Sequence, residues 1–267
     1  MISIMIQKEM RSEKDPLQKL KFYSGDVRDE DPFDSLYSDA KAYVTLNALL
    51  FDGIETEKAR VKEGRKLNPS FIRRYEDTLS IIHGIIACMK PLEQETVVYR
   101  VERLTDYRKF IQAGKMTSFV SCSDMEFLDS YTDKEDLVFM EVHVKQGVLC
   151  AHLEDELEDY LKQDEHELLI SPYCPIRVKQ TCVPEQYSAV RDRNGNPVCI
   201  YTFVDVYPAF LHETYAPVCF DQKLIERCCK VIESLNRQEE VDEQNLQAYL
   251  SFKKMIHNTV KNDMTVM

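Results

Sequence analysis

Three short patterns in this sequence combine residue types that could do chemistry. The sequence VYR ends at Arg100, FVSCS occupies 119–123, and EHELLI occupies 165–170. An arginine offers a planar, permanently charged fork for phosphate or ribose oxygens. A carboxylate can stabilise a developing positive charge or take up a proton. Each pattern alone is typical of a solvated charge, a turn or one strand face, but their order and apolar flanks indicate a single site.

The three patterns lie in a region that is predicted to be rich in strands. β-Branched and aromatic runs predict strands at 96–99, 118–121, 137–144, 167–170, 176–181, 186–191 and 198–204. Asn194-Gly195 is a strong signal for a hairpin between the last two strands. Because alternate residues of a strand share a face, we expect Glu165 and Glu167 on one face and His166 on the other.

Helical patterns flank this region on both sides. Apolar residues spaced three and four apart predict helices at 34–51, at 56–66, and from Asn68 to a stop at Lys90-Pro91. Two further helices are predicted at 221–236 and about 243–258. Helices followed by strands and then by helices indicate an α+β fold rather than an alternating α/β fold. We expect a flexible lead-in over 1–22, an N-terminal helical lobe over 23–95, a β-sandwich core over 96–208 and a C-terminal helical extension over 209–267.

The composition limits the classes of function. The chain has 267 residues, of which 44% are hydrophobic, and this is typical of a globular protein. Its 46 acidic and 34 basic residues give a net charge of −12. This charge disfavours nucleic acid and anionic membranes and suits a basic protein partner. The sequence contains no glycine-rich phosphate loop and no apolar run long enough for membrane insertion.

The cysteines and the N-terminus bear on the cellular compartment. The nine cysteines are irregularly spaced and form no C-x-x-C, so we expect reduced thiols and no metal. The N-terminus has a six-residue apolar start, which is too short for a signal-peptide core. We therefore expect a cytoplasmic protein, or one that is secreted into a host cell by a signal-peptide-independent system.

The three patterns together resemble the mono-ADP-ribosyltransferases of the Arg–Ser–Glu class, which includes clostridial binary toxins and vertebrate ecto-enzymes. Members of that family have an arginine on an early strand, a hydrophobic strand ending in Ser-Thr-Ser, and Glu-x-Glu opening a later strand. This chain supplies Arg100, Ser121-Cys122-Ser123 and Glu165-His166-Glu167, and the matched stretch covers 34–203. Cys122 replaces the usual threonine, and Val101 replaces the common glycine after the arginine.

The resemblance implies a split β-sandwich of two antiparallel-rich sheets with an NAD cleft between them. It also implies an enzyme that transfers ADP-ribose from NAD⁺ to a target protein and releases nicotinamide. A glutamate at position 165 implies arginine as the acceptor. Many such enzymes are bacterial toxins or effectors, and we expect the same of this chain.

The resemblance also implies roles at the catalytic centre. Arg100 binds the pyrophosphate or a ribose, and Ser121 holds Glu167 in position. Glu167 stabilises the oxocarbenium-like transition state. Glu165 orients or deprotonates the incoming nucleophile. Ser123 supports the end of its strand.

Further residues are implied in NAD binding. The backbone of Val101 clamps the nicotinamide carboxamide. Tyr43 and Asn47, one helical turn apart, face the nucleotide. Phe127 or Tyr131 covers the nicotinamide ring.

Other functions remain open at this stage. An NAD glycohydrolase, with water in place of the acceptor, would use the same residues. A catalytically silent interaction module on the same scaffold is a third possibility, and a chance match in a soluble α+β protein is a fourth. The stretch from 152 to 167 holds eight acidic residues and one lysine, which favours a protein substrate with a basic surface.

Overall fold

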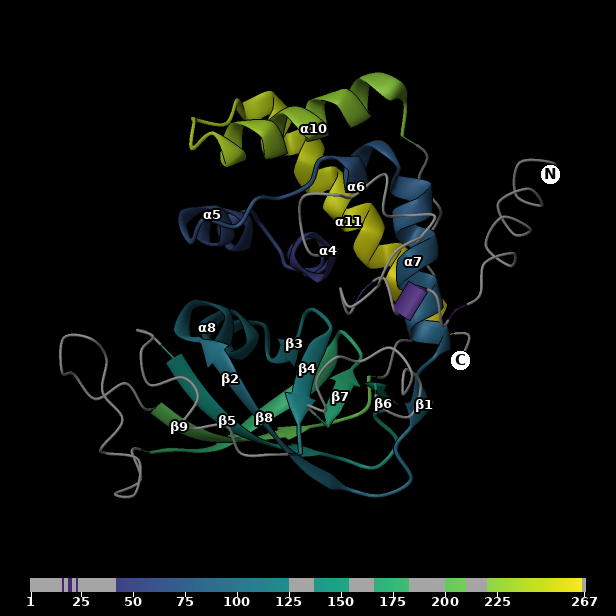
Figure 1. Ribbon diagram of the computed structural model, residues 1–267, viewed down its shortest axis with the longest axis vertical. Helices are drawn as coiled ribbons and strands as arrows, with labels where there is room; N and C mark the ends of the chain where they lie inside the picture. The colour runs from purple at the N-terminus through teal and green to yellow at the C-terminus, as the bar shows by residue number, and fades with distance from the viewer. Residues whose placement is uncertain are drawn as a thin grey trace. The chain divides into compact units, whose positions relative to one another are not determined.

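The structure is a computed structural model (Figure 1). It describes Pro16, Lys19, Leu20, Tyr23 and residues 42–124, 137–153, 166–182, 200–209 and 220–265. The chain divides into two compact units, one made of Met1–Cys88 with Phe210–Met267 and the other of Met89–Ala209. In the part that is described, the first unit is helical and the second is built around a sheet.

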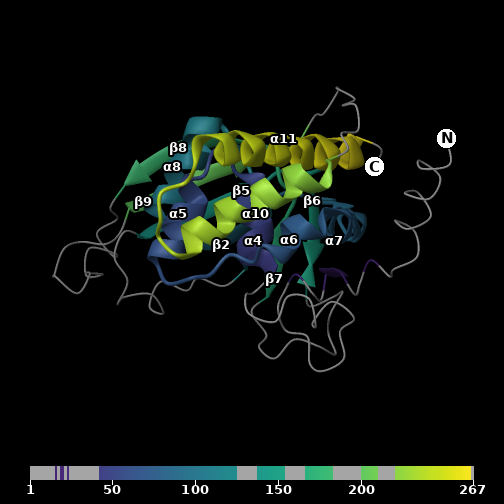
Figure 2. The same cartoon turned by 90° about the horizontal axis from the view of Figure 1, so that it is seen from above.

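The helical unit joins segments from both ends of the sequence. Its elements with described bounds are α4 (Ala42–Leu50), α5 (Glu55–Lys62), α6 (Ser70–Arg73), α7 (Tyr75–Ala87), α10 (Gln222–Asn236) and α11 (Glu243–Thr265). Helices α10 and α11 run side by side (Figure 2). Helix α11 also packs against α4 and α7, and α10 packs against α5 and α6. The C-terminal helices are therefore part of the same core as the N-terminal ones.

The ends of these helices follow from local side chains. Asn68 Oδ1 accepts a hydrogen bond from the backbone N–H of Ser70 at 2.9 Å, as the helix start predicted at Asn68 requires. The helix expected from there is divided into α6 and α7 because Arg74 leaves helical geometry, with φ −117° and ψ 48°. Asp221 caps α10 by accepting from Leu224 N at 2.8 Å.

A buried ion pair links α5 to α11. Lys253 Nζ lies 2.5 Å from Glu57 Oε1, and neither side chain is more than 2% exposed. Tyr249 Oη donates to the same oxygen at 2.8 Å, and Lys253 also donates to the carbonyl oxygen of Gly53 at 2.7 Å. Burial lowers the pKa of Lys253, and the charge of Glu57 partly opposes this shift. Each charge is thus held in the core by its partner.

His257 is a second buried titratable group on α11. The residue is 8% exposed, and its Nε2 donates to the carbonyl oxygen of Leu49 at 2.8 Å. Burial lowers the pKa of His257 from 6.5 to about 4, although the bond to Leu49 and the charge of Asp52 act in the other direction. Lys253 and Lys261 contribute to the lowering. The folded state therefore holds this imidazole neutral at pH 7.

The second unit is built around a sheet. Its strands are β1 (Lys90–Pro91), β2 (Thr96–Arg103), β3 (Lys115–Met116), β4 (Val120–Ser123), β5 (Leu137–Val144), β6 (Leu149–His152), β7 (Glu167–Ile170), β8 (Cys174–Cys182) and β9 (Ile200–Val206). Within the described residues they form one nine-stranded sheet in the order β1-β6-β7-β4-β2-β5-β9-β8-β3. The β5–β9 pair is parallel, and the other pairs are antiparallel.

The predicted α+β class is confirmed, with helices at both ends of the chain and a mixed sheet between them. The two expected sheets are linked into one. Between β2 and β4 the register contains a single pair, Tyr99 opposite Ser123, whereas β2 and β5 pair over eight residues from Thr96 to Arg103. That single pair links β2 to β4, and so joins the strands on either side of it into one sheet.

Some elements were not expected or cannot be compared. Helix α8 (Leu104–Ala113) lies inside the region predicted as strands and packs against β2, β3, β5 and β8. It buries Tyr107 and Phe110 and ends at Gly114, whose φ of 64° suits glycine. Strand β6 was not predicted either. The strand predicted at 186–191 and the hairpin at Asn194-Gly195 lie outside the described residues.

No helix that the structure describes is long and apolar enough to cross a membrane.

The buried pair of Glu57 and Lys253 makes a prediction about stability. Replacing Lys253 by Met leaves the Glu57 carboxylate buried without its cation, so the free energy of unfolding should fall by about 3–5 kcal/mol. Urea denaturation at pH 7 measures this change. The matched control is Lys254→Met, because Lys254 is the exposed neighbour on the same helix. Equal losses in both variants would contradict the role of the pair, and adding Glu57→Gln to Lys253→Met should recover part of the loss.

His257 makes a prediction about pH. The unfolded chain binds a proton at this imidazole below about pH 6.5, whereas the folded chain does not until about pH 4. The free energy of unfolding should therefore decrease as the pH falls through that window, by on the order of 3 kcal/mol from this group. Urea titrations at pH 7.5 and 5 should show a smaller decrease for His257→Gln than for the wild type. Identical decreases in both proteins would overturn the assignment.

Candidate functional site

The three sequence patterns meet at the point where β2, β4 and β7 lie side by side. Ser123 at the end of β4 is opposite Tyr99 of β2 and opposite Glu167, the first residue of β7. Strand β4 is therefore the central strand of this meeting point, which we call the junction. The junction brings Arg100, Ser121 and Glu167 together, although they are up to 67 positions apart in the sequence.

Arg100 connects β2 to β4 through its side chain. Its Nη1 donates to the carbonyl oxygen of Ser121, and its Nε donates to Glu102 Oε2 at 2.7 Å. Nη2 lies 2.7 Å from the same Glu102 oxygen, and the Arg100 side chain is 24% exposed. The guanidinium is thus held from two sides, by Glu102 and by the Ser121 carbonyl, in a side chain that is partly exposed.

Ser121 connects β4 to β7. Its hydroxyl donates to Glu167 Oε1. Ser121 and Glu167 can meet because Ser121 is opposite Leu169, two residues along β7, which places the two side chains diagonally on one face of the pair. The hydroxyl therefore orients the carboxylate, and the half-buried Glu167 keeps access to solvent.

Glu102 is a residue of the site that the sequence analysis did not identify. Its side chain is 5% exposed, and its second oxygen, Oε1, accepts from the backbone N–H of Arg103 at 2.9 Å. The strand predicted at 96–99 stops short of this residue, whereas β2 continues to Arg103 and places Arg100 and Glu102, two residues apart, on one face. A buried carboxylate requires a charged or hydrogen-bonded partner, and Arg100 provides one.

Cys122 lies on the other face of β4 from Ser121 and Ser123 and is 3% exposed. Burial raises the pKa of its thiol to about 12, with the charge of Arg100 acting against the rise and those of Glu102 and Glu167 adding to it. This cysteine is therefore a packing residue. Ser123, at 4% exposure, is buried as well.

Val101 follows Arg100 on β2 and is opposite Phe139 of β5. It lies beyond the single residue pair that joins β2 to β4. Its backbone is therefore at the place where these two strands separate.

The Glu-x-Glu pattern differs from the expected strand geometry. Strand β7 begins at Glu167, and His166 before it has a φ of 46°. The alternation that placed Glu165 and Glu167 on one strand face therefore does not extend back through His166. The His166 ring is 47% exposed, with Nδ1 3.6 Å from Asp124 Oδ2. Glu165, Phe127 and Tyr131 lie outside the described residues.

Tyr43 and Asn47 lie on α4 of the helical unit, one turn apart. Both contact Tyr23. Asn47 Nδ2 donates to Tyr23 Oη at 2.9 Å, and the rings of Tyr23 and Tyr43 meet edge to face with centroids 6.4 Å apart. Their role toward a nucleotide stays a prediction.

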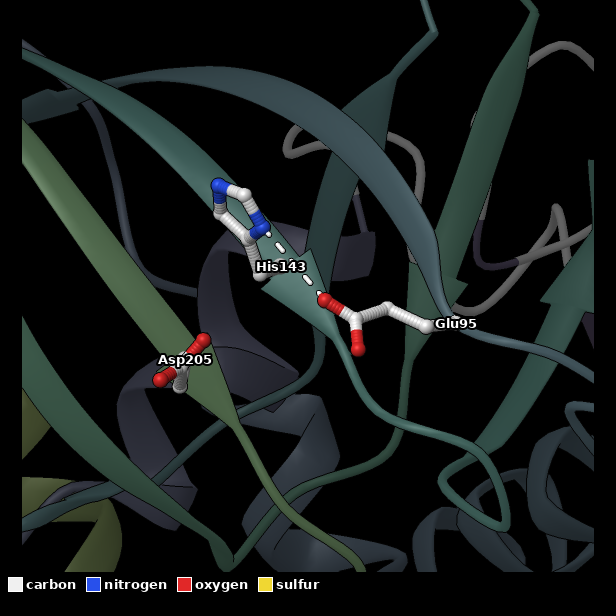
Figure 3. Close-up of side chains that lie close together, drawn as sticks. All are labelled: Glu95, His143 and Asp205. Atoms are coloured by element: carbon white, nitrogen blue, oxygen red, sulfur yellow. Dashed lines mark ion pairs between the residues drawn. The ribbon is translucent and has the colours of Figure 1, made fainter.

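A second cluster of charged groups lies on the same sheet. Glu95, His143 and Asp205 bring potential metal-ligand atoms within 4.8 Å of one another (Figure 3). However, Lys145 Nζ lies 2.7 Å from Glu95 Oε1 and 3.0 Å from Asp205 Oδ1, and Lys179 Nζ lies 2.8 Å from the same Asp205 oxygen.

These lysines govern the charge of the cluster. The hydrogen bond from Lys145 lowers the pKa of Glu95. Burial raises the pKa of Asp205, but the bonds from Lys179 and Lys145 outweigh it and lower the value overall. Because ammonium groups already neutralise the carboxylates, we interpret the cluster as a network of ion pairs and not as a metal site.

Taken alone, the junction offers a fixed guanidinium on β2 and an oriented carboxylate on β7, the two strands that flank β4. A guanidinium binds phosphate oxygens, and an ionised carboxylate stabilises a nearby positive charge. The arrangement therefore suits a ligand that carries phosphate and develops positive charge a short distance away.

A scan of protein-family models finds no match to this sequence. A search of curated proteins finds no match either.

Solved structures of bacterial ADP-ribosyltransferases are similar to this structure. An ADP-ribosyltransferase from Clostridium botulinum is 9% identical, with 76% of this chain and 91% of that chain covered and a TM-score of 0.42. Vis toxin from Vibrio splendidus is 14% identical, with 73% of each chain covered and a TM-score of 0.38. The C3 exoenzyme from Clostridium limosum is 9% identical, with 73% of this chain and 96% of that chain covered and a TM-score of 0.40.

The search of solved structures thus returns bacterial ADP-ribosyltransferase toxins, and the Arg–Ser–Glu class stays a prediction from the sequence. The likenesses are distant, and the functional argument rests on the residues of the junction.

The burial of Cys122 makes a prediction about reactivity. A thiol with a pKa of about 12 is ionised in about one molecule in 10⁴ at pH 8, and the thiolate is the reactive form. Iodoacetamide should therefore leave Cys122 unmodified in the native protein while it labels Cys88, which is half-buried. Peptide mass spectrometry over a time course measures both rates, and denaturation in urea should make them similar. Native labelling of Cys122 at the rate of Cys88 would show that the junction is open to solvent from that face.

Proposed function

We propose that this protein is an NAD-dependent mono-ADP-ribosyltransferase of the Arg–Ser–Glu class. The observation that carries the proposal is the pair of contacts that unite the three patterns. Arg100 donates to the Ser121 carbonyl, and the Ser121 hydroxyl donates to Glu167. Patterns that met by chance would have no reason to form one connected set of hydrogen bonds on three strands.

NAD⁺ in this proposal is a co-substrate and not a resident cofactor. The Arg100 guanidinium binds its pyrophosphate, since a planar fork matches two phosphate oxygens at once. The backbone of Val101 holds the nicotinamide carboxamide where β2 and β4 separate. Tyr43 and Asn47 face the nucleotide, and Phe127 or Tyr131 covers the nicotinamide ring.

The chemical step breaks the bond between the nicotinamide nitrogen and C1′ of its ribose. The bonding electrons leave with nicotinamide, so the ribose develops the charge of an oxocarbenium ion. Glu167 stabilises that charge, provided that it is ionised and close. Ser121 fixes its orientation through a neutral hydroxyl, so the contact adds no positive charge that would compete with the ribose.

The acceptor completes the reaction. A nucleophilic nitrogen of the target attacks C1′, a new C–N bond forms, and the nitrogen loses a proton. Glu165 is placed by its sequence position to accept that proton or to orient the acceptor. A glutamate at this position favours an arginine side chain as the acceptor.

The target is proposed to be a protein with a basic surface. The segment before Glu167 concentrates acidic residues, and the chain as a whole carries a net charge of −12. Complementary charge would steer such a partner toward the site. The activity fits a bacterial effector or toxin that modifies a protein of another cell.

The test compares Glu167→Gln with the wild type. The amide keeps an oxygen that can accept from Ser121 but carries no charge, so kcat for nicotinamide release should fall about 10²–10³-fold. The matched control is Glu141→Gln on β5, the strand beside β2, whose carboxylate contacts His143 and Tyr201. This control should keep the wild-type rate. A wild-type protein that neither binds nor consumes NAD⁺ would overturn the proposed function.

The acceptor is identified by labelling. With NAD⁺ labelled in its ADP-ribose part, a small guanidino compound such as agmatine should become labelled if arginine is the acceptor. Protein bands in a eukaryotic lysate should become labelled in the wild type and not with Glu167→Gln. Consumption of NAD⁺ with neither product labelled would identify an NAD glycohydrolase instead.

A further inference from the structure

Glu102 is a buried carboxylate at the junction for which the proposed reaction has no direct use. It lies on β2 two residues after Arg100 and is 5% exposed. Moving an ionised carboxylate out of water is costly unless it is paired and hydrogen-bonded. A buried carboxylate beside the site therefore indicates a function that a smaller or apolar side chain would not provide.

The contacts of Glu102 fix its own position. Oε2 accepts from Nε of Arg100 and lies 2.7 Å from its Nη2, and Oε1 accepts from the backbone N–H of Arg103. Both oxygens are thus used, and one of them is tied to the main chain. The Glu102 side chain thus bridges the backbone of β2 and the Arg100 guanidinium, and we call this pair of contacts the Glu102 bridge.

The same contacts fix the orientation of Arg100. Glu102 holds the Nε side of the guanidinium plane, and the carbonyl oxygen of Ser121 holds Nη1. These two anchors come from different strands, β2 and β4, and both lie on the same side of the single Tyr99–Ser123 pair. An arginine side chain has several rotatable bonds, so a ligand that meets a free guanidinium must first order it.

We propose that Glu102 is a positioning residue that pre-orients Arg100 for the pyrophosphate of NAD⁺. The inference rests on the proposed function and deepens it, because it assigns the orientation of the phosphate-binding group to a second side chain. Glu102 acts through Arg100 and does not touch the reacting atoms.

Removing the Glu102 charge has two opposing effects on phosphate binding, so the direction of the change tests the proposal. A neutral side chain would leave the guanidinium with more positive potential, and this would strengthen phosphate binding. It would also release the guanidinium, and this would weaken phosphate binding. Glutamine cannot make both contacts of the Glu102 bridge. Its amide has only one oxygen, so its NH₂ group would face either the Arg103 N–H or the guanidinium, and both of these are donors. Positioning therefore predicts weaker binding, and simple electrostatics predicts stronger binding.

The experiment measures NAD⁺ consumption by the full chain carrying Glu102→Gln, with Glu141→Gln as the matched control. KM for NAD⁺ should rise about three- to ten-fold, with kcat nearly unchanged, because the ordering of one long side chain costs about 0.5–1.5 kcal/mol. Inhibition constants provide the decisive readout. The constant for ADP-ribose, which contains the pyrophosphate, should rise in parallel, and the constant for nicotinamide, which lacks it, should not change.

An unchanged or lower KM for NAD⁺ in Glu102→Gln would overturn the proposal, as would equal rises for ADP-ribose and nicotinamide. Absence of activity in the wild type would instead overturn the proposed function, so the two failures are distinguishable. If Glu102→Gln does not fold by circular dichroism, Glu102→Asp is the second variant. It keeps the charge but is one methylene shorter, so it cannot reach both Arg103 N and the guanidinium, and the same selective rise is expected.

Discussion

The single residue pair between β2 and β4 is the constraint on which the site depends. A longer ladder would bring the two strands together along their length and would satisfy their backbone groups with each other. With only Tyr99 opposite Ser123, the backbone of β4 beyond that point needs another donor. Arg100 provides one by donating to the Ser121 carbonyl. The side chain proposed to bind phosphate is therefore also part of the connection between two halves of the sheet.

Each unit contains a buried glutamate that is paired with a cation, but the two pairs have different consequences. Glu57 is enclosed with Lys253 in the helical core, where the pair is at most 2% exposed. Glu102 is similarly buried, but its partner Arg100 is 24% exposed. The first pair can contribute only to the fold, because no ligand reaches it. The second pair places a cation at the boundary between protein and solvent, where its orientation matters to whatever binds there.

The sequence predicted those parts of the structure that depend on local pattern. The start at Asn68, the helices from 221 and 243, and the strand at 137–144 follow from capping residues and apolar spacing. Helix α8 was missed because Tyr107 and Phe110 are its only buried apolar residues, although Gly114 was a signal for its end. The parallel pairing of β5 with β9 joins segments more than 50 positions apart, and no local pattern specifies it.

The site could be predicted only where its residues belong to local sequence patterns. Arg100, Ser121 and Glu167 were identified because each belongs to a short pattern, and the structure connects them through the carbonyl and the hydroxyl of Ser121. Glu102 was missed because it lies outside all three patterns, and its burial depends on strands that are distant in the sequence. The left-handed backbone at His166 could not be foreseen either, since strand alternation gives no sign of a positive φ in a non-glycine residue.

The order of contacts along the junction explains how one site can hold opposite charges without cancelling them. Glu102 neutralises part of the Arg100 charge on the buried side, where an unpaired cation would be costly. Ser121 stands between Arg100 and Glu167, offering its carbonyl to the former and its hydroxyl to the latter. Because the group that orients Glu167 is a neutral hydroxyl, this contact fixes the carboxylate without neutralising it. In the proposed reaction the negative charge of Glu167 is then available when positive charge develops on the ribose, and the ordering of both groups is complete before NAD⁺ binds.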